Sequence, residues 1–190
     1  MRNIAAQLWQ KYGVAVAIRT YKGKSPLIGA RAFVDDTAVV IGDVELGDDV
    51  SIWPTSVVRG DVERIKIGNG TNVQDGAVLH VSHAGDFSPK GHPLNIGLGV
   101  TIGHRAVVHA CTIGNYCLIG IGAIVMDDAE LGDYVMLGAG ALVTPGKKLE
   151  SGFLYVGAPA KQIRALTDAE KEFLEYSAKH YVRLKDDYLD

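Results

Sequence analysis

Aliphatic residues recur along this chain at steps of six. The residue that follows each of them is often glycine, and the residue four positions after it is usually small or β-branched. The aliphatic positions fall into four blocks: Ile28, Val34, Val40, Leu46, Ile52 and Val58; Ile67, Val73 and Leu79; Ile96, Ile102 and Val108; and Ile113, Ile119, Val125, Leu131, Leu137 and Val143. A repeat of six residues predicts an all-β solenoid in which short strands wind into a parallel β-helix.

A triangular coil explains the period, because each hexad supplies one side of the triangle. The aliphatic residue points into the interior and the small residue occupies the tight corner. The hexads make about six coils, which at roughly 4.8 Å per coil give a prism about 29 Å long. No coil buries its own apolar side, so stacking supplies the stability. A β-sandwich would instead show two-residue alternation and frequent turn signals, and the sequence has neither. The period leaves handedness open.

Two insertions interrupt the repeat. The longer one, Ser82 to Pro93, is polar and rich in glycine and proline, and we expect it to leave the prism wall as a loop. Loops of this length in a compact fold are often functional. A smaller insertion near Glu63 to Lys66 separates two blocks of the repeat. We therefore divide the chain into an N-terminal segment (1–27), a β-helix domain (28–160) and a C-terminal helical segment (161–190).

The C-terminal segment carries a helix signal. Thr167 followed by Glu170 forms a capping box at the start of a predicted helix. Five residues are predicted to share one side of that helix, which would lie on the prism or against a neighbouring subunit: Phe173, Leu174, Ala178, Tyr181 and Tyr188. Near the other end of the chain, Ile4 to Tyr12 is a candidate for a short helix.

Composition is that of a single domain. The chain has 190 residues and a formal net charge of −3, so electrostatics gives no reason to expect nucleic acid or an anionic membrane as a partner. No apolar run reaches the length of a membrane span. The apolar stretch Val14 to Ile18 is too short for a secretory signal, and we expect a cytoplasmic protein. Cys111 and Cys117 lie inside the repeat, which favours buried, reduced thiols over a disulfide.

The repeat predicts where three histidines point. His80 and His109 each directly follow an aliphatic residue, and their hexads stack one coil apart on the same face. Two such imidazoles can converge to the separation of about 3.3 Å that neighbouring zinc ligands need. His104 belongs to the adjacent face. A metal site that uses all three therefore requires His104 from a neighbouring subunit, as cyclic threefold packing of prisms would supply.

Charged and polar residues surround these positions. Arg59 stacks one coil from His80, with Asp61 two residues further on, whereas Gln74 and Asp75 stack one coil from His104. The two groups would meet across the proposed interface. The alternative is an ordinary solvated surface, because a solenoid exposes most positions outside the repeat. Against it, the usual glycine is replaced on these faces by other residues: Trp53, Arg59, Gln74, His80 and His109.

Several motifs together resemble the gamma-class carbonic anhydrases and their small bacterial relatives. They are Arg59-Gly60-Asp61, Asn72-Val73-Gln74-Asp75-Gly76, Leu79-His80, Gly103-His104 and His109. The similarity runs from about Ile28 to Ala160 and into the C-terminal helix. It implies a left-handed β-helix, a homotrimer, and zinc, or else iron or cobalt, bound between subunits by His80, His104 and His109.

The resemblance also implies reversible hydration of carbon dioxide to bicarbonate, with the metal lowering the pKa of bound water from about 15.7 to near 7. Gln74 would orient that water or hydroxide, as residues beside metal ligands generally do. Arg59, Asp61 and Asp75 are expected to form ion pairs that hold the interface and the site. Tyr181, on the C-terminal helix, is a further candidate to reach the site.

The chain departs from the family pattern at the residues that carry protons away from the metal site. Well-studied members have a glutamate directly after the residue that matches Asp61, and another in an acidic loop after the first histidine ligand. Here the first position is Val62 and the loop begins Val81-Ser82-His83. His83 or His92 could take the role, since imidazole titrates near neutrality. We expect weak or conditional carbonic anhydrase activity.

Two other functions remain open. Hexapeptide prisms also include acyltransferases that use one histidine as a general base, and relatives of this branch have been proposed as acyl-coenzyme A thioesterases. A noncatalytic trimeric scaffold with a structural metal is the third alternative. Structural zinc usually has four protein ligands, whereas three leave an open position, which favours catalysis. The sequence identifies neither the metal nor the physiological substrate.

Overall fold

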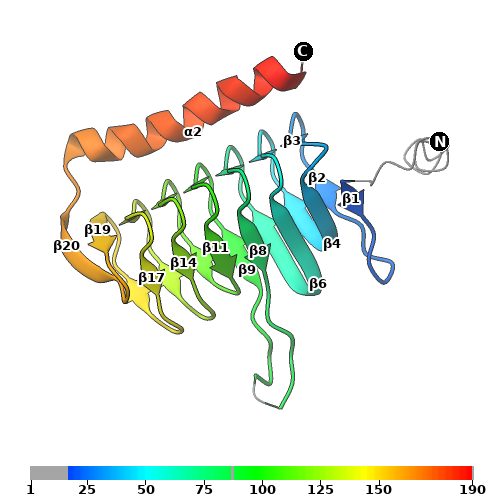
Figure 1. Cartoon of the computed structure of the whole chain (residues 1–190), viewed down its shortest axis with the longest axis horizontal. Helices are drawn as coiled ribbons and strands as arrows, with labels where there is room; N and C mark the ends of the chain where they lie inside the picture. Colours follow the sequence, from blue (N-terminus) through cyan, green and yellow to red (C-terminus); the bar gives the residue numbers. More distant parts are fainter. Residues whose placement is uncertain (1–16, 87, 190) are drawn as a thin grey trace.

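The chain folds into a triangular prism of stacked coils with one long helix along its side (Figure 1). A computed structural model describes residues 17–86 and 88–189. The predicted left-handed parallel β-helix with a C-terminal helix is confirmed. Neighbouring coils pair through parallel strands. The candidate helix Ile4 to Tyr12 lies outside the described residues.

Three strand columns form the faces of the prism. The first face contains β2 (Leu27–Ile28), the end of β4 (Val39–Leu46), the end of β6 (Val57–Ile67), β9 (Leu94–Ile96), β12 (Thr112–Ile113), β15 (Glu130–Leu131) and β18 (Lys148–Leu149). The second face contains β3 (Phe33–Val34), β5 (Ser51–Ile52), β7 (Asn72–Val73), β10 (Thr101–Ile102), β13 (Leu118–Ile119), β16 (Met136–Leu137) and β19 (Phe153–Val156). The third contains β1 (Ile18–Arg19), the starts of β4 and β6, β8 (Val78–His80), β11 (Val107–His109), β14 (Ile124–Val125) and β17 (Leu142–Val143).

The core is the predicted aliphatic ladder. On each face the repeat residue pairs with its equivalent one coil away; on the third face, for example, Leu79 pairs with Val58 and with Val108. These side chains are fully buried, which makes stacking the source of stability. The period of six also continues beyond Val143, since Leu149 stacks on Leu131 and Tyr155 stacks on Leu137. The prism therefore extends partly into a further coil.

The smaller insertion does not leave the prism as a separate loop. β4 and β6 pass around a corner side by side, and the extra residues of β6 are absorbed by a register shift between Gly42 and Val44. The backbones approach closely there, because a Cβ on Gly60 would lie 2.5 Å from the carbonyl oxygen of Asp43. Glycine is thus required at the corner, where β6 passes from the third face to the first.

The longer insertion projects from the prism as predicted (Figure 1). Its stem is closed by backbone hydrogen bonds between Ser82 and His92, at 3.0 and 3.1 Å, and a second bridge joins Gly85 and Ser88. The hairpin leaves the prism at Ser82, two residues after His80. Its stem consequently lies next to the histidines of the third face.

The C-terminal helix α2 (Asp168–Leu189) covers the second face and contacts β3, β5, β7 and β10. The capping box forms, because Glu170 N–H donates to Thr167 Oγ1 and the Thr167 N–H donates to the Glu170 carboxylate, at 3.2 and 2.9 Å. Leu174 and Ala178 are buried against the prism. Phe173 and Tyr188, which were predicted on the same side, are 51% and 61% exposed, so they lie at the edge of the buried stripe.

A short strand connects the prism to helix α2 along the chain. β20 (Lys161–Ala165) pairs antiparallel with β19 and ends the second-face sheet. At the far end of α2, the ammonium group of Lys185 is fully buried and lies 3.1 Å from Asp49, with Asp186 as a second partner. The helix is thus attached at both ends. No described helix is both long enough and apolar enough to cross a membrane.

Candidate functional site

His80 and His109 face each other on the third face. Their strands pair in register, so that the two residues are direct neighbours across one coil. His80 Nδ1 lies 3.1 Å from His109 Nε2, and both side chains are partly buried. Burial lowers the pKa of His80, and it outweighs the hydrogen bond to Asp61, which acts to raise that pKa; the positive charge of Arg59 also lowers it. A neutral imidazole is the form that ligates metals, so this surrounding favours the ligand form of His80.

Asp61 and Arg59 hold the outer side of His80. The Asp61 carboxylate lies 3.0 Å from His80 Nε2, and Arg59 donates to its other oxygen at 2.5 Å. Burial acts to raise the pKa of Asp61, but hydrogen bonds from Arg59 and His80 outweigh it and keep the pKa below its usual value. Asp61 therefore stays ionised and orients the ring. Within one chain, Arg59 and Asp61 therefore form an ion pair with each other.

Asp127 orients His109 in the same way and was missed from the sequence. His109 Nδ1 lies 2.6 Å from Asp127 Oδ1, and Ser82, in the stem of the hairpin, donates to the other carboxylate oxygen. Burial acts to raise the pKa of Asp127, whereas the hydrogen bonds from Ser82 and His109 lower it, with a net lowering. One signal was available: Asp127 stands eighteen positions after His109, which is one full coil of the repeat.

His104 lies on the second face, in the turn after β10, as its hexad predicted. Its Nδ1 is 2.9 Å from Asp75, and both side chains are about half exposed. Tyr181 of α2 lies beside this pair: burial and the negative charge of Asp75 both raise its pKa. The Tyr181 ring also packs edge-on against Trp53, at 5.7 Å between centroids. Tyr181 is therefore close to the residues around His104.

Gln74 is buried beside this turn. Its Nε2 donates to Asn72 Oδ1 at 3.1 Å, and Asn72 is itself fully buried. One amide hydrogen of Gln74 is thus directed into the protein, so the orientation of its side chain is fixed.

The two loop histidines differ. His83 is exposed and projects with the hairpin. His92 is partly buried in the stem, with Nδ1 3.5 Å from the Asp128 carboxylate. Asp128 directly follows Asp127, so His92 contacts the residue next to the carboxylate that orients His109.

These residues form two separate groups on one chain. We call Arg59, Asp61, His80, His109 and Asp127 the His80 cluster, and Gln74, Asp75 and His104 the His104 cluster. Across residues 17–86 and 88–189, no three His, Cys, Asp or Glu side chains of a single chain come together as a metal site. The His80 cluster lies on the third face and the His104 cluster on the second, which is the division that the register predicted.

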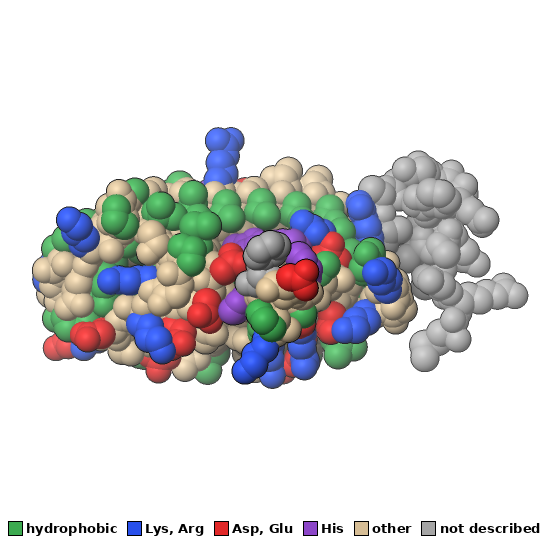
Figure 2. Space-filling model, turned by 90° about the horizontal axis from the view of Figure 1, so that it is seen from below, with side chains coloured by type: hydrophobic (Ala, Val, Ile, Leu, Met, Phe, Trp, Pro, Cys, Tyr) green, Lys and Arg blue, Asp and Glu red, His purple; other side chains and the backbone are tan. Residues whose placement is uncertain are grey.

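An apolar row runs along the prism beside the His80 cluster. The outward residues that precede the ladder positions of the third face stack in register, and they are Val39, Val57, Val78, Val107, Ile124 and Leu142. Figure 2 shows a row of hydrophobic side chains next to the histidines and their acidic neighbours. Val78 and Ile124 are each 39% exposed and the other members are partly exposed, so the row is a candidate contact surface. We name these six residues the apolar row.

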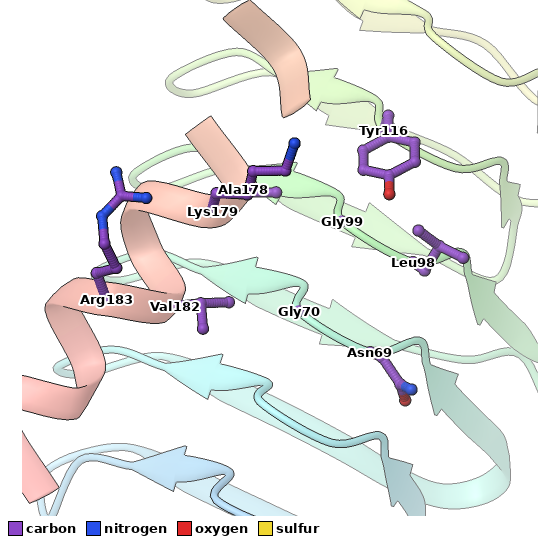
Figure 3. Close-up of a pocket in the computed structure, with 9 residues that line it drawn as sticks. All are labelled: Asn69, Gly70, Leu98, Gly99, Tyr116, Ala178, Lys179, Val182 and Arg183. Carbon is purple, nitrogen blue, oxygen red and sulfur yellow. The ribbon is translucent and has the colours of Figure 1, made fainter. Parts of the chain in front are cut away.

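A separate hollow of about 350 Å³ lies between α2 and the corner turns of the prism (Figure 3). Leu98 and Tyr116 line it from the prism, and Val182 and Arg183 line it from the helix. No residue of the His80 or His104 cluster lines it. The hollow is therefore distinct from the histidine sites.

Comparisons with known proteins agree with the repeat. The family model described as bacterial transferase hexapeptide (six repeats) matches residues 25–60 and 110–145. Protein YrdA of Escherichia coli is 56% identical over 173 residues, which are 91% of this chain and 94% of that protein. A carbonic anhydrase of Geobacillus kaustophilus is 42% identical over 165 residues, 87% of each chain.

The chain belongs to the gamma carbonic anhydrase-like family of hexapeptide-repeat proteins. Within this broad group, the crystal structure of a hexapeptide transferase family protein from Anaplasma phagocytophilum superposes with a TM-score of 0.83 at 43% identity, covering 90% of this chain and 98% of that one. The gamma carbonic anhydrase-like assignment agrees with the motifs, since the two histidine clusters are built from them.

Proposed function

We propose that the protein is a gamma-class carbonic anhydrase that hydrates carbon dioxide reversibly at metal sites between the subunits of a homotrimer. The observation that carries the proposal is the His80–His109 pair. Two imidazole nitrogens face each other at 3.1 Å, and the remaining nitrogen of each ring contacts a carboxylate. Carboxylate–histidine pairing of this kind orients metal ligands.

The donor set fits zinc, and also Fe²⁺ or Co²⁺. Tetrahedral zinc bonds of about 2.0–2.1 Å place neighbouring ligand nitrogens about 3.3 Å apart, close to the observed 3.1 Å. His80 and His109 would hold the metal together with His104 of a neighbouring subunit. A bound metal would supply a Lewis acid that brings the pKa of coordinated water near neutrality.

The remaining residues of the two clusters would orient the metal ligands and the substrate. Asp61, Asp75 and Asp127 each fix one histidine ring, and Arg59 keeps Asp61 ionised and in place. Gln74 would offer its amide to an oxygen of the water or substrate. Tyr181, half-buried beside Asp75, would cover one side of the metal site.

The apolar row supports the trimer. It lies on the face that carries the His80 cluster, and the turn with His104 lies on the adjacent face. Packing the third face of one prism against the corner turn of the next that carries His104, beside its helix α2, would bury the row and bring His104 toward His80 and His109. A head-to-tail contact of this kind closes into a ring, which gives three sites per trimer.

Metal content and hydration rate test the proposal together. The protein is purified anaerobically, its metal per chain is measured, and stopped-flow carbon dioxide hydration is recorded beside a thioesterase assay on acyl-coenzyme A. We expect about one divalent ion per chain and hydration activity that His80→Ala removes. A metal-free protein without hydration activity would refute the proposal, and thioester hydrolysis without hydration would favour the acyl-coenzyme A alternative.

Mixing two inactive variants tests whether the site is shared. His80→Ala damages only the third face of a subunit, whereas His104→Ala damages only the second. In every mixed ring, one interface joins an intact third face to an intact second face. Random reassembly of equal amounts should therefore restore about one quarter of the wild-type sites. If all three ligands came from one chain, mixing would restore nothing.

The proton route is expected to limit the rate. Val62 is 43% exposed where better-studied relatives have a glutamate, and it carries no ionisable group. His92, in contact with Asp128, is the better placed of the two loop histidines to carry protons, and His83 is the more exposed. Added imidazole buffer should raise the hydration rate if proton transfer is limiting. A rate that does not respond to buffer would place the limit elsewhere.

A further inference from the structure

A buried chain of hydrogen bonds connects helix α2 to Gln74. Ser177 Oγ of α2 lies 2.9 Å from Thr101 Oγ1 of β10, and Asn72 Nδ2 of β7 donates to Thr101 Oγ1 at 3.0 Å. Gln74 Nε2 then donates to Asn72 Oδ1 at 3.1 Å. The four residues are 9%, 3%, 0% and 5% exposed in this order. Each therefore depends on the others for its hydrogen bonds.

The direction of the hydrogen bonds matters, because an amide side chain has one donor end and one acceptor end. Asn72 directs its Nδ2 toward Thr101 Oγ1 and, at 3.4 Å, toward the carbonyl of Val100. Only its Oδ1 is then left for Gln74. If Asn72 turned over, its amide nitrogen would meet the Gln74 nitrogen, and both would be donors.

The Thr101 hydroxyl acts together with the Val100 carbonyl to set the orientation of Asn72. A hydroxyl both donates and accepts, so Thr101 alone would tolerate either end of Asn72. Because Thr101 Oγ1 accepts from Asn72 Nδ2, its own hydrogen is free to be donated to Ser177 Oγ, which lies 2.9 Å away. The partner on α2 therefore offers that hydrogen an acceptor, which favours the orientation in which Thr101 presents a lone pair to Asn72.

We propose that Thr101 and Ser177 are positioning residues that orient Asn72 and, through it, the amide of Gln74. The proposal rests on the function proposed for the histidine site, in which Gln74 offers its amide to the reacting oxygen. It also gives α2 a second role, because the helix both covers the second face and sets the direction of a hydrogen bond at the site. Three consecutive polar residues in the covered column, Ser51, Asn72 and Thr101, are consistent with a polar network kept beneath an otherwise apolar contact.

Thr101→Val is the direct test, because it removes the hydroxyl and keeps the shape. We expect kcat for hydration to fall about tenfold, as is typical when a group behind the site is lost, with unchanged metal content and trimer. Thr101→Ser keeps the hydroxyl and should restore kcat. Thr112→Val, the same exchange at an exposed strand position, is the matched control and should have no effect.

Three outcomes would overturn the proposal: a Thr101→Val rate equal to that of Thr112→Val, equal losses in Thr101→Val and Thr101→Ser, or a Ser177→Ala rate equal to wild type. Ser177→Ala also serves if Thr101→Val fails to fold. A second readout does not need activity. In crystals of the metal-free variants at about 1.2 Å, where amide nitrogen and oxygen can be told apart, Asn72 should be turned over or disordered in Thr101→Val and unchanged in Thr101→Ser.

The crystallographic readout separates the two proposals. An inactive wild-type protein would refute the proposed function, yet the amide orientations would still decide whether Thr101 positions Asn72. An Asn72 amide that is unchanged in Thr101→Val refutes the positioning role whatever the activity.

Discussion

Asp127 and His109 are joined across one coil of the prism, with the carboxylate Oδ1 2.6 Å from the imidazole Nδ1. This contact leaves Nε2 of His109 as the nitrogen that faces His80. Asp127 is therefore part of the site through its contact with His109.

Asp127→Asn should weaken metal binding by about 10–100-fold, because a neutral amide no longer holds His109 in its ligand form as an ionised carboxylate does. The measurement is competition with a metal chelator, monitored by metal content after dialysis. Asp128→Asn is the matched control: Asp128 is 67% exposed, and asparagine accepts its positive φ of 59°. Equal losses in both variants would contradict a specific role for Asp127.

Lys185→Met should destabilise the protein by about 2 kcal/mol. This is below the roughly 3–5 kcal/mol expected when one partner of a fully buried pair is removed, because Asp186 is about half exposed and Arg31 remains to pair with Asp49. Urea unfolding at one fixed protein concentration measures the change. Lys179→Met, at an exposed helix position, should change stability by less than about 0.5 kcal/mol. Similar values for both would show that the Lys185 contacts contribute nothing.

Cys111 and Cys117 should not react with thiol reagents in the folded protein. Both are buried and unpaired, and burial raises the pKa of both thiols, that of Cys117 to about 12. At pH 8 the fraction of Cys117 present as the reactive thiolate is lower than that of a free cysteine by a factor on the order of a thousand. Ellman's reagent should therefore detect two thiols in guanidinium chloride and almost none without it. Rapid native labelling would contradict their burial.

Acid should weaken the start of α2 through Glu170. Hydrogen bonds from Arg164 and from Thr167 lower its pKa from 4.5 to about 2. A lowered folded-state pKa means that the stabilisation is complete above about pH 4.5 and is lost as the pH falls toward 2. The difference in urea midpoint between wild type and Glu170→Gln should accordingly be larger at pH 6 than at pH 2.5. Glu172 is an exposed carboxylate nearby on the helix. For Glu172→Gln, the difference in urea midpoint from wild type should be the same at pH 6 and at pH 2.5.

The prism and the division of the histidines could be predicted because both depend on a period that is written along the chain. Once Leu79 and Val108 are inward, His80 and His109 must be outward neighbours, and His104 must lie elsewhere. The same period extends past the predicted blocks, since Leu149 and Tyr155 continue it. The placement of Arg59 next to Asp61 and His80 came from the same register.

The contacts made by α2 could not be predicted in this way. Thr101 is an outward position on its strand, and its burial depends on where a distant helix lies, which no local period encodes. The exposure of Phe173 has the same origin, because the rotation of the helix is set by Leu174, Ala178 and Lys185 together. Asp127 was different, since its offset of one coil from His109 is visible in the sequence and places it beside that histidine.

The reversal of direction at β20 determines where the repeat ends on the second face. A stack of equivalent parallel coils has no inherent length, and its last open edge could in principle receive the first coil of another copy. β20 runs antiparallel on β19 and presents Lys161 and Arg164 from an exposed strand. An incoming parallel coil would meet a strand that runs in the opposite direction. The reversed strand therefore closes the repeat on the second face, whereas β17 and β18 are the last strands of the other two faces.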